Sequence, residues 1–261
     1  MTELAQRLNL APQLTDRIAL LENKKVEILA KRCISNGFHI LKKENDIVRL
    51  AVILNLAVKV RKKYIEAGIE DRVYYDTMSD IRIWCERNNN KGLKNYGWLK
   101  NHVSFELFRL GRLQFQLYEC KNKTLPYNKL PFSYGEKLVY IHIPEGEKLE
   151  KEKCIDAIKQ AGEFFDTHFP DYNYKYYFCE SWLLFEGNRD FMAEGSNILN
   201  FMALFDVRCS VKIDAQAIER IFGKRCIIKR HYPENTDLQK RAKKYIQSGN
   251  CLGIGIGTIK R

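Results

Sequence analysis

Three side chains that can exchange protons lie in two short apolar runs of the C-terminal half. Tyr140 and His142 alternate within Leu138–Ile143, so a strand there places both on one face. Glu180 lies in a second run, Tyr174–Leu184. Histidine and glutamate can act as general bases, and tyrosine can act as a proton donor. Structural roles stay open as alternatives: His142 would hold the turn after its strand, and Glu180 would be paired within the fold.

The segment between the two runs predicts how they are joined. Pro144 and Gly146 end the first run, and a helical period starts near Glu150. The apolar face of that helix is formed by Cys154, Ile158, Ala161 and Phe165. A helix between two strands of one sheet makes the strands parallel and the connection right-handed. A histidine at the end of a central parallel strand lies where α/β proteins tend to gather ligands.

The N-terminal part carries helical periodicity through residue 111. A helix starting at Asn45 or Asp46 and reaching about Glu66 is apolar nearly all round, which indicates packing on several sides. A later helical face is formed by Leu99, Val103, Leu107 and Leu110. We expect Gly111 to end that helix, and a strand with alternating polarity to begin at Arg112.

The C-terminal part interleaves strands and helices. Residues 120–136 read as a long loop that contains the domain boundary. We therefore predict a mostly helical domain over residues 1–125, which ends in a strand, and an α/β domain over residues 126–261. Cys226–Ile228 suggests a short strand, and the spacing of Thr236 and Gln239 predicts a helix capping box. Leu252–Gly257 alternates with glycine, so one face of that strand admits a close neighbour.

The charge balance favours a polyanionic partner. The sequence has 44 basic and 32 acidic residues, a net charge of +12, and the phosphates of nucleic acid or of coenzyme A would both suit it. Arg109 and Arg112 flank Gly111 and could clamp phosphate, or they could fasten the helices to the sheet. A basic C-terminal cluster could meet a phosphate or form a solvated face; it comprises Lys224, Arg225, Lys229, Arg230, Lys240, Arg241, Lys243 and Lys244.

Several classes of protein are disfavoured. Residues from Met1 onward lack the pattern of a secretory signal, and the longest apolar run, Leu50–Val58, is about half of the ~20 residues that a membrane span needs. The eight cysteines occur singly, without a Cys-x-x-Cys pair, so we expect a reducing cytoplasm and no metal site. Cys179 and His142 could form a nucleophile pair only with a third, orienting residue, which the sequence does not supply.

An ordered set of motifs from about residue 75 onward resembles a family of bacterial acyltransferase-like proteins. These proteins join a helical N-acyltransferase N-terminal domain to a GNAT-like C-terminal domain. The matching residues are Trp84, Tyr96-Gly97-Trp98, Arg109 to Phe115, Ile141 to Gly146, Phe164-Phe165, Phe169-Pro170, Cys179 to Leu184, Ser196-Asn197-Ile198, Phe222-Gly223 and Pro233 to Gln239.

The resemblance implies a GNAT-like mixed sheet flanked by helices and direct transfer of an acyl group from acetyl-CoA or another acyl-CoA to a small amine. His142 or Glu180 would be the base, and Tyr140 or Tyr245 the acid. The pyrophosphate of coenzyme A would lie on the loop after Leu138–Ile143, near a helix N-terminus.

The cofactor-binding residues implied in that loop are Ile143, Gly146 and Lys148, with Arg109 and Arg112 nearby. The loop departs from the usual pattern of Arg or Gln with two glycines, since it has one glycine and two acids. Glu145 and Glu147 would repel a pyrophosphate unless they point away from it. We keep two alternatives: a non-catalytic GNAT-like binding module, and a nucleic-acid-binding protein, which we favour least. We expect no membrane partner.

Overall fold

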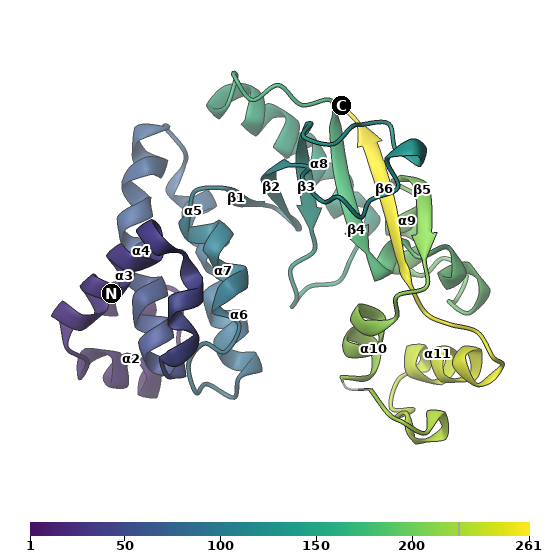
Figure 1. The fold of residues 1–261 in the computed structure, drawn as a ribbon, viewed down its shortest axis with the longest axis horizontal. Coiled ribbons are helices and arrows are strands. Elements are labelled where there is room, and N and C mark those ends of the chain that lie inside the picture. The colour runs from purple at the N-terminus through teal and green to yellow at the C-terminus, as the bar shows by residue number, and fades with distance from the viewer. Residues whose placement is uncertain (224) are drawn as a thin grey trace. The chain divides into compact units, whose positions relative to one another are not determined.

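The computed structural model describes residues 1–223 and 225–261, which form two compact units (Figure 1). The first unit comprises Met1–Gln116, Ile143–Glu147 and Phe164–Phe169. The second comprises Leu117–His142, Lys148–Glu163 and Pro170–Arg261. The boundary expected between residues 125 and 126 stays a prediction.

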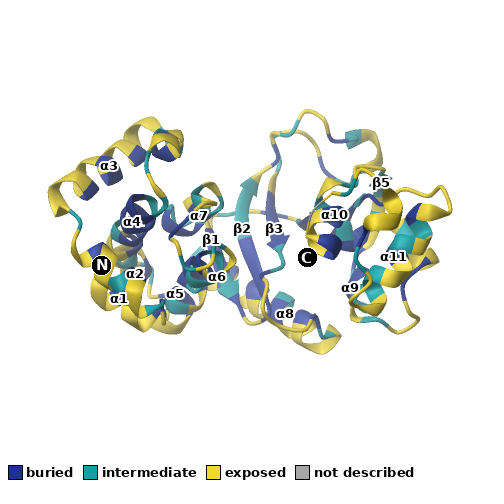
Figure 2. Ribbon diagram, turned by 90° about the horizontal axis from the view of Figure 1, so that it is seen from below, coloured by how far each residue is buried: buried dark blue, intermediate teal, exposed yellow. Residues whose placement is uncertain are grey.

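The first unit is helical around one buried helix. Its helices are α1 (Thr2–Arg7), α2 (Pro12–Ala19), α3 (Asn23–Asn36), α4 (Asp46–Glu66), α5 (Asp71–Met78), α6 (Asp80–Arg87) and α7 (Tyr96–Val103). Asn45 caps α4, because its side chain accepts from the backbone N–H groups of Ile47 and Val48 at 3.1 and 3.0 Å. Figure 2 shows α4 largely buried, which confirms the prediction of packing on several sides.

The predicted helix through Leu110 is wrong. Helix α7 ends at Val103, and β1 (Leu107–Leu110) instead forms an antiparallel hairpin with β2 (Leu113–Glu119). Phe105 adopts a φ of 65° between them, which breaks the helix. Its ring packs edge-on to Tyr64, with the ring centroids 4.9 Å apart. Leucines three or four apart fit a helix, and tertiary packing overrode that local period.

The second unit carries the predicted strand, helix and strand. β3 (Lys137–His142) leads through α8 (Lys151–His168) to β4 (Tyr176–Ser181), and the two strands pair in parallel. The remaining elements are α9 (Asn197–Met202), β5 (Asp206–Val211), α10 (Ala215–Phe222), α11 (Asp237–Gln247) and β6 (Ile254–Lys260). The strand order is β1-β2-β3-β4-β6-β5, and β6 is antiparallel to both of its neighbours. The mixed α/β class is therefore confirmed.

Two different structures cover the two faces of the sheet in this unit. Helix α8 lies on one face, where a Cβ at Gly162 would come within 3.6 Å of the Tyr177 hydroxyl (Figures 1 and 2). The segment between β2 and β3 lies on the other face and buries Leu125 and Phe132. These two side chains belong to one apolar cluster with Phe178, so this face is closed near the middle of β4.

The glycines of β6 admit a turn of the same chain. A Cβ at Gly255 would collide with the backbone carbonyl of Leu184, in the short 3₁₀ turn Trp182–Leu184 that follows β4. The turn is fixed because Ser181 Oγ accepts from the backbone N–H of Leu183 at 3.2 Å. The alternating glycines predicted that another element would lie close to β6. That element is the backbone of the turn Trp182–Leu184.

The C-terminal elements confirm one prediction and correct another. Thr236 and Gln239 form the capping box of α11, with the Gln239 backbone N–H donating to Thr236 Oγ1 at 3.2 Å. The strand predicted over Cys226–Ile228 is wrong, because no strand partner reaches that segment in the described chain. β-branched residues favour strands only where a neighbouring strand is present to pair with them.

No helix in residues 1–223 or 225–261 combines the length and the apolar character needed to cross a membrane. In the same residues, no group of three or more histidine, cysteine or carboxylate side chains is arranged to hold a metal ion.

Candidate active site

The structure brings Tyr140, His142 and Glu180 together at the carboxyl ends of β3 and β4. The rings of Tyr140 and His142 stack with centroids 4.1 Å apart and planes inclined by 21°. The Tyr140 hydroxyl donates to the backbone carbonyl of Glu180 at 3.2 Å. All three side chains are half-buried. The three residues singled out from the sequence thus lie near one another, and their catalytic roles stay predictions.

An aromatic wall stands beside the group. Tyr140 lies edge-on to Phe178, with centroids 4.8 Å apart, and edge-on to Tyr118 at 5.4 Å. Tyr118 and Phe178 stack with planes only 8° apart. The candidate residues predicted from sequence omitted Tyr118. Its alternation within the predicted strand from Arg112 was the available signal, but the neighbouring strand could not be known from that pattern.

Strands β3 and β4 pair over a short length before the site. Among the described residues, their parallel ladder joins Val139 with Tyr177 and Tyr140 with Phe178, although β3 continues to His142 and β4 to Ser181. Beyond the ladder, the Tyr140 side chain supplies a hydrogen bond to β4. The carboxyl ends of adjacent parallel strands are where α/β proteins commonly bind ligands.

Burial sets the protonation behaviour of the site. It raises the pKa of the Glu180 carboxyl above its ordinary value, which brings this group closer to the range of an effective general base near neutral pH. Burial also raises the pKa of Tyr140 well above its ordinary value, and negative charge on Cys179, Glu180 and Tyr118 would add to the shift. The pKa of Tyr118 rises to about 12, mainly through burial. Both phenols therefore stay protonated and able to donate hydrogen bonds.

The raised pKa of Glu180 predicts a pH-dependent contribution to stability. Below about pH 4.3, the ordinary glutamate pKa, the carboxyl is protonated in both folded and unfolded chains, and its contribution is most favourable. As the pH rises towards the folded-state pKa, the unfolded chain releases its proton first, so the free energy of unfolding falls. Glu180→Gln cannot ionise, so its stability relative to wild type should increase as the pH rises above about 4.3 towards neutral.

Urea denaturation of both proteins across that range measures the effect. Glu152→Gln, which removes an exposed carboxylate from α8, controls for the change in net charge. A difference between Glu180→Gln and wild type that stays constant with pH would contradict the prediction.

Two arginines fasten the loop after β3. Arg112 is only 5% exposed and donates from Nη1 to the Pro144 carbonyl at 3.0 Å and from Nη2 to the Glu147 carbonyl at 2.8 Å. Arg109 donates to Ser79 Oγ at 3.3 Å and to Glu147 Oε1 at 2.5 Å. All of these contacts lie within the first unit, where they hold the backbone and one acidic side chain of the loop. A role of Arg109 and Arg112 in cofactor binding stays a prediction.

The two acidic side chains of this loop are matched by arginines. Glu145 Oε1 accepts from Arg87 Nη1 at 2.7 Å, and Glu147 accepts from Arg109. The repulsion of a pyrophosphate that these acids suggested is therefore offset by two guanidinium charges. Gly146 lies between them with a φ of +101°, a backbone conformation that favours glycine. The backbone conformation is therefore sufficient to explain a glycine at this position. The predicted cofactor contacts of Ile143, Gly146 and Lys148 stay predictions.

Two other candidates lie away from this group. Tyr245, the alternative acid, belongs to α11, and its hydroxyl donates to Asp190 Oδ2 at 3.3 Å. Its ring packs on Phe191, in a different apolar cluster from the one that contains Phe178. Cys179 is fully buried on the opposite face of β4 from Glu180, and burial raises the pKa of its thiol. A thiolate nucleophile is therefore disfavoured there.

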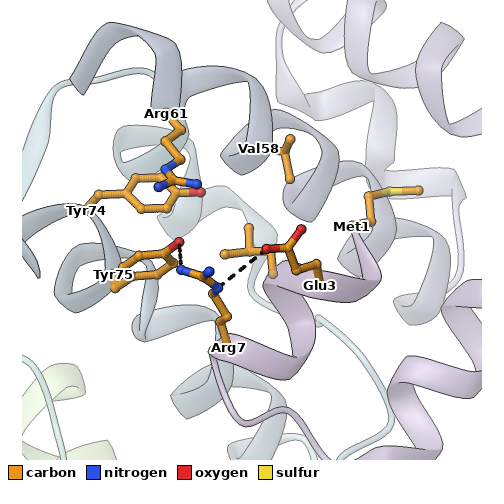
Figure 3. A pocket seen from close by; sticks show the side chains of 8 residues that line it. Met1, Glu3, Arg7, Val58, Arg61, Tyr74 and Tyr75 are labelled. Carbon is orange, nitrogen blue, oxygen red and sulfur yellow. Dashed lines mark hydrogen bonds and ion pairs between the residues drawn. The ribbon is translucent and has the colours of Figure 1, made fainter. Parts of the chain in front are cut away.

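A separate cavity of about 120 Å³ lies in the first unit (Figure 3). Its walls include Arg7 and Arg61, whose guanidinium carbons lie 5.3 and 5.5 Å from the centre of the Tyr75 ring. Arg7 contacts Glu3, and Arg61 contacts Asp71, so both cations are matched by carboxylates. The carboxylate that lines this cavity, Glu3, is exposed, whereas Glu180 on β4 is half-buried. We therefore place the candidate active site at β3 and β4.

Two models of known protein domains together match nearly the whole sequence. A model of the N-acyltransferase N-terminal domain matches residues 1–105, and a model of the GNAT-like C-terminal domain matches residues 107–259. No curated protein matches the sequence.

Solved structures of the same fold include an acyltransferase in complex with decanoyl-CoA and teicoplanin. It is 21% identical, with a TM-score of 0.82 over 99% of this chain and 86% of that one. An acyltransferase in complex with CoA and 10C-teicoplanin is 20% identical over the same shares, also with a TM-score of 0.82. An acyltransferase mutant in complex with octanoyl-CoA is 21% identical, with a TM-score of 0.80 and the same coverage. At such identities, the likeness shows the fold.

The GNAT-like model alone spans more than half of the chain, and the motifs noted in the sequence fall mostly within it. The chain therefore belongs to the family of proteins that join an N-acyltransferase N-terminal domain to a GNAT-like C-terminal domain.

Proposed function

We propose that the protein transfers an acyl group from an acyl-CoA to an amine, with the chemistry at the carboxyl ends of β3 and β4. The observation that carries the proposal is the contact group of Tyr140, His142 and Glu180 within a GNAT-like domain. This group offers a carboxyl with a raised pKa beside a protonated phenol. Direct transfer of an acyl group needs a base for the amine and a donor for the leaving thiolate.

The reaction would proceed in two steps. The neutral amine nitrogen attacks the thioester carbonyl carbon and forms the C–N bond, and Glu180 accepts the proton that the nitrogen loses. The C–S bond then breaks, coenzyme A leaves as the thiolate, and the proton passes from Glu180 to sulfur. Atoms and charges balance, because the net change moves one proton from nitrogen to sulfur.

Tyr140 serves this scheme as a hydrogen-bond donor. A thiol has an ordinary pKa of about 8.5, and burial raises the pKa of Tyr140 well above the ordinary range of tyrosine. Full proton transfer from this phenol to the thiolate would be uphill, whereas a hydrogen bond to developing negative charge is favourable. His142, stacked on Tyr140, is the alternative base.

The structural neighbours support medium-chain acyl-CoA as the co-substrate. They are acyltransferases: one complex contains decanoyl-CoA and teicoplanin, a second contains CoA and 10C-teicoplanin, and a mutant is bound to octanoyl-CoA. We extend the acyl-CoA, and an amine as the acceptor class, to this chain. The loop with Ile143, Gly146 and Lys148 would hold the pyrophosphate. A cytoplasmic setting also belongs to the proposal, supported by eight free cysteines.

Calorimetric titration with acetyl-CoA, octanoyl-CoA and free CoA tests the proposal. Octanoyl-CoA has six more CH₂ groups than acetyl-CoA, and each buried CH₂ contributes about 0.8 kcal/mol. We expect saturable binding of all three, with octanoyl-CoA binding at least about tenfold more tightly than acetyl-CoA even if only two of these groups are buried. Thiol release in the presence of an amine panel would then identify the acceptor. Absence of heat with every acyl-CoA would leave the non-catalytic alternative.

A further inference from the structure

We propose that the segment Arg225–His231 docks on an anionic lipid surface, with Ile227 and Ile228 entering the membrane interface. This segment joins α10 to α11 and is the one whose predicted strand the structure overturned. The inference concerns a surface outside the β3–β4 site, so it stands or falls independently of the proposed acyl transfer.

The isoleucines are presented on an anchored segment. Ile227 is 102% exposed and Ile228 is 47% exposed. Phe222 before the segment and Tyr232 after it are both buried, and their rings stack with centroids 4.3 Å apart. The two ends of the segment are thus held together in the apolar core while its middle stays in solvent. A fully exposed isoleucine gives up no packing when it enters a lipid interface, whereas its transfer out of water is favourable.

The surroundings of the isoleucines are basic. No Asp or Glu occurs between Glu219 and Glu234 in the sequence, while the described basic residues of that interval are Arg220, Arg225, Lys229 and Arg230. Lys229 is oriented by its bond from Nζ to the Ile246 carbonyl at 3.1 Å. Arg225 pairs with Asp214, which offsets part of the local charge.

The exposed side of α11 adds to this charge. Lys240, Arg241 and Lys244 are all exposed on that helix. The acids nearest to them in the chain are paired, Asp237 with Lys240 at 3.6 Å and Glu234 with Lys243 at 3.1 Å. The apolar tip, Ile227 and Ile228, thus lies in a stretch of sequence where basic residues outnumber acidic ones. This composition complements a membrane that carries negative headgroups.

The side chains at the tip favour lipid over nucleic acid. Proteins bind single strands by stacking bases on exposed aromatic rings above a basic groove. The rings of Phe222 and Tyr232, on either side of the tip in sequence, are only 6% and 4% exposed and stack on each other. Isoleucine offers neither hydrogen bonds nor a planar face, but it partitions well into an acyl interface. The contact would be peripheral.

Vesicle co-sedimentation tests the inference. The full chain should pellet with vesicles of phosphatidylcholine containing 30% phosphatidylglycerol, and at least about fivefold less with pure phosphatidylcholine or at high salt. Ile227→Ser with Ile228→Ser should weaken the binding to anionic vesicles at least about fivefold. Ile34→Ser is the matched control, because Ile34 is 72% exposed on α3, and it should bind as wild type does.

A second variant keeps the test decisive if the double variant folds poorly. Ile227→Trp should bind anionic vesicles at least as well as wild type, and its added fluorescence should shift to shorter wavelength on binding. No pelleting with anionic vesicles, equal loss in Ile34→Ser, or an unshifted Trp signal would overturn the inference. So would tighter binding to a DNA oligonucleotide than to vesicles with no effect of the double serine variant, since that pattern belongs to a nucleic-acid surface.

Discussion

Glu180→Gln is expected to lower kcat for acyl transfer by about 10²- to 10⁴-fold, the usual contribution of a general base. Gln preserves the shape of the side chain and its place beside Tyr140 but cannot accept the amine proton. The acyl-CoA Kd should change less than about threefold, because the substitution leaves the predicted cofactor loop intact. Single-turnover thiol release together with calorimetric titration separates the two quantities.

The pH profile gives this prediction a second signature. Catalysis by the Glu180 carboxylate requires its ionised form, so wild-type kcat/KM should fall as the pH drops through the pKa of this group, which burial raises above the ordinary glutamate value. The residual activity of Glu180→Gln should lack this acidic limb. Glu152→Gln, which alters an exposed residue of α8, should keep both rate and profile.

His142→Ala separates the two possible bases. If Glu180 is the base, His142→Ala should retain the acidic limb, even though the loss of stacking on Tyr140 lowers the rate. Wild-type activity in Glu180→Gln, with loss of the limb in His142→Ala instead, would transfer the role to His142.

Gly255→Ala is expected to lower the free energy of unfolding of the second unit by about 3 kcal/mol, near the upper end for overpacking. The added Cβ would collide with the carbonyl of Leu184 and approach the Phe185 backbone N within 2.8 Å. Both obstacles are backbone, which cannot rotate away as a flexible side chain can. Relief would require β6 to separate from the turn that follows β4.

Thermal unfolding followed by circular dichroism measures this change. A loss of about 3 kcal/mol corresponds to a Tm lower by about 6–12 °C for a unit of this size. Gly162→Ala is the matched control in the same unit, because its Cβ would meet Tyr177 only at 3.6 Å and alanine favours the helix. That control should melt at or slightly above the wild-type temperature. A Tm within 1 °C of wild type for Gly255→Ala would show that the turn can move at little cost.

The sequence by itself determined the order of β3, α8 and β4. It also determined which residues these three elements bring together. Alternation placed Tyr140 and His142 on one face, and the intervening helical period made β4 a parallel neighbour that carries Glu180. These features are local, because periods of two and of 3.6 residues follow from backbone geometry within each element. The capping box at Thr236 was predictable for the same reason.

Only the tertiary structure decided which distant groups meet. Arg87 and Arg109 match Glu145 and Glu147 across 58 and 38 residues of sequence, and no local pattern foretells those pairs. The same holds for the place of Tyr118 beside Tyr140.

Some predictions were wrong because the same local pattern fits two kinds of secondary structure. Leu107 and Leu110 are spaced as on a helical face, yet they lie in β1, which pairs with β2. The packing of Phe105 against Tyr64 favours the break before that strand. Ile227 and Ile228 had the composition of a strand, yet no neighbouring strand was there to pair with them. Local sequence sets what an element can be, and long-range packing decides whether its partners are present.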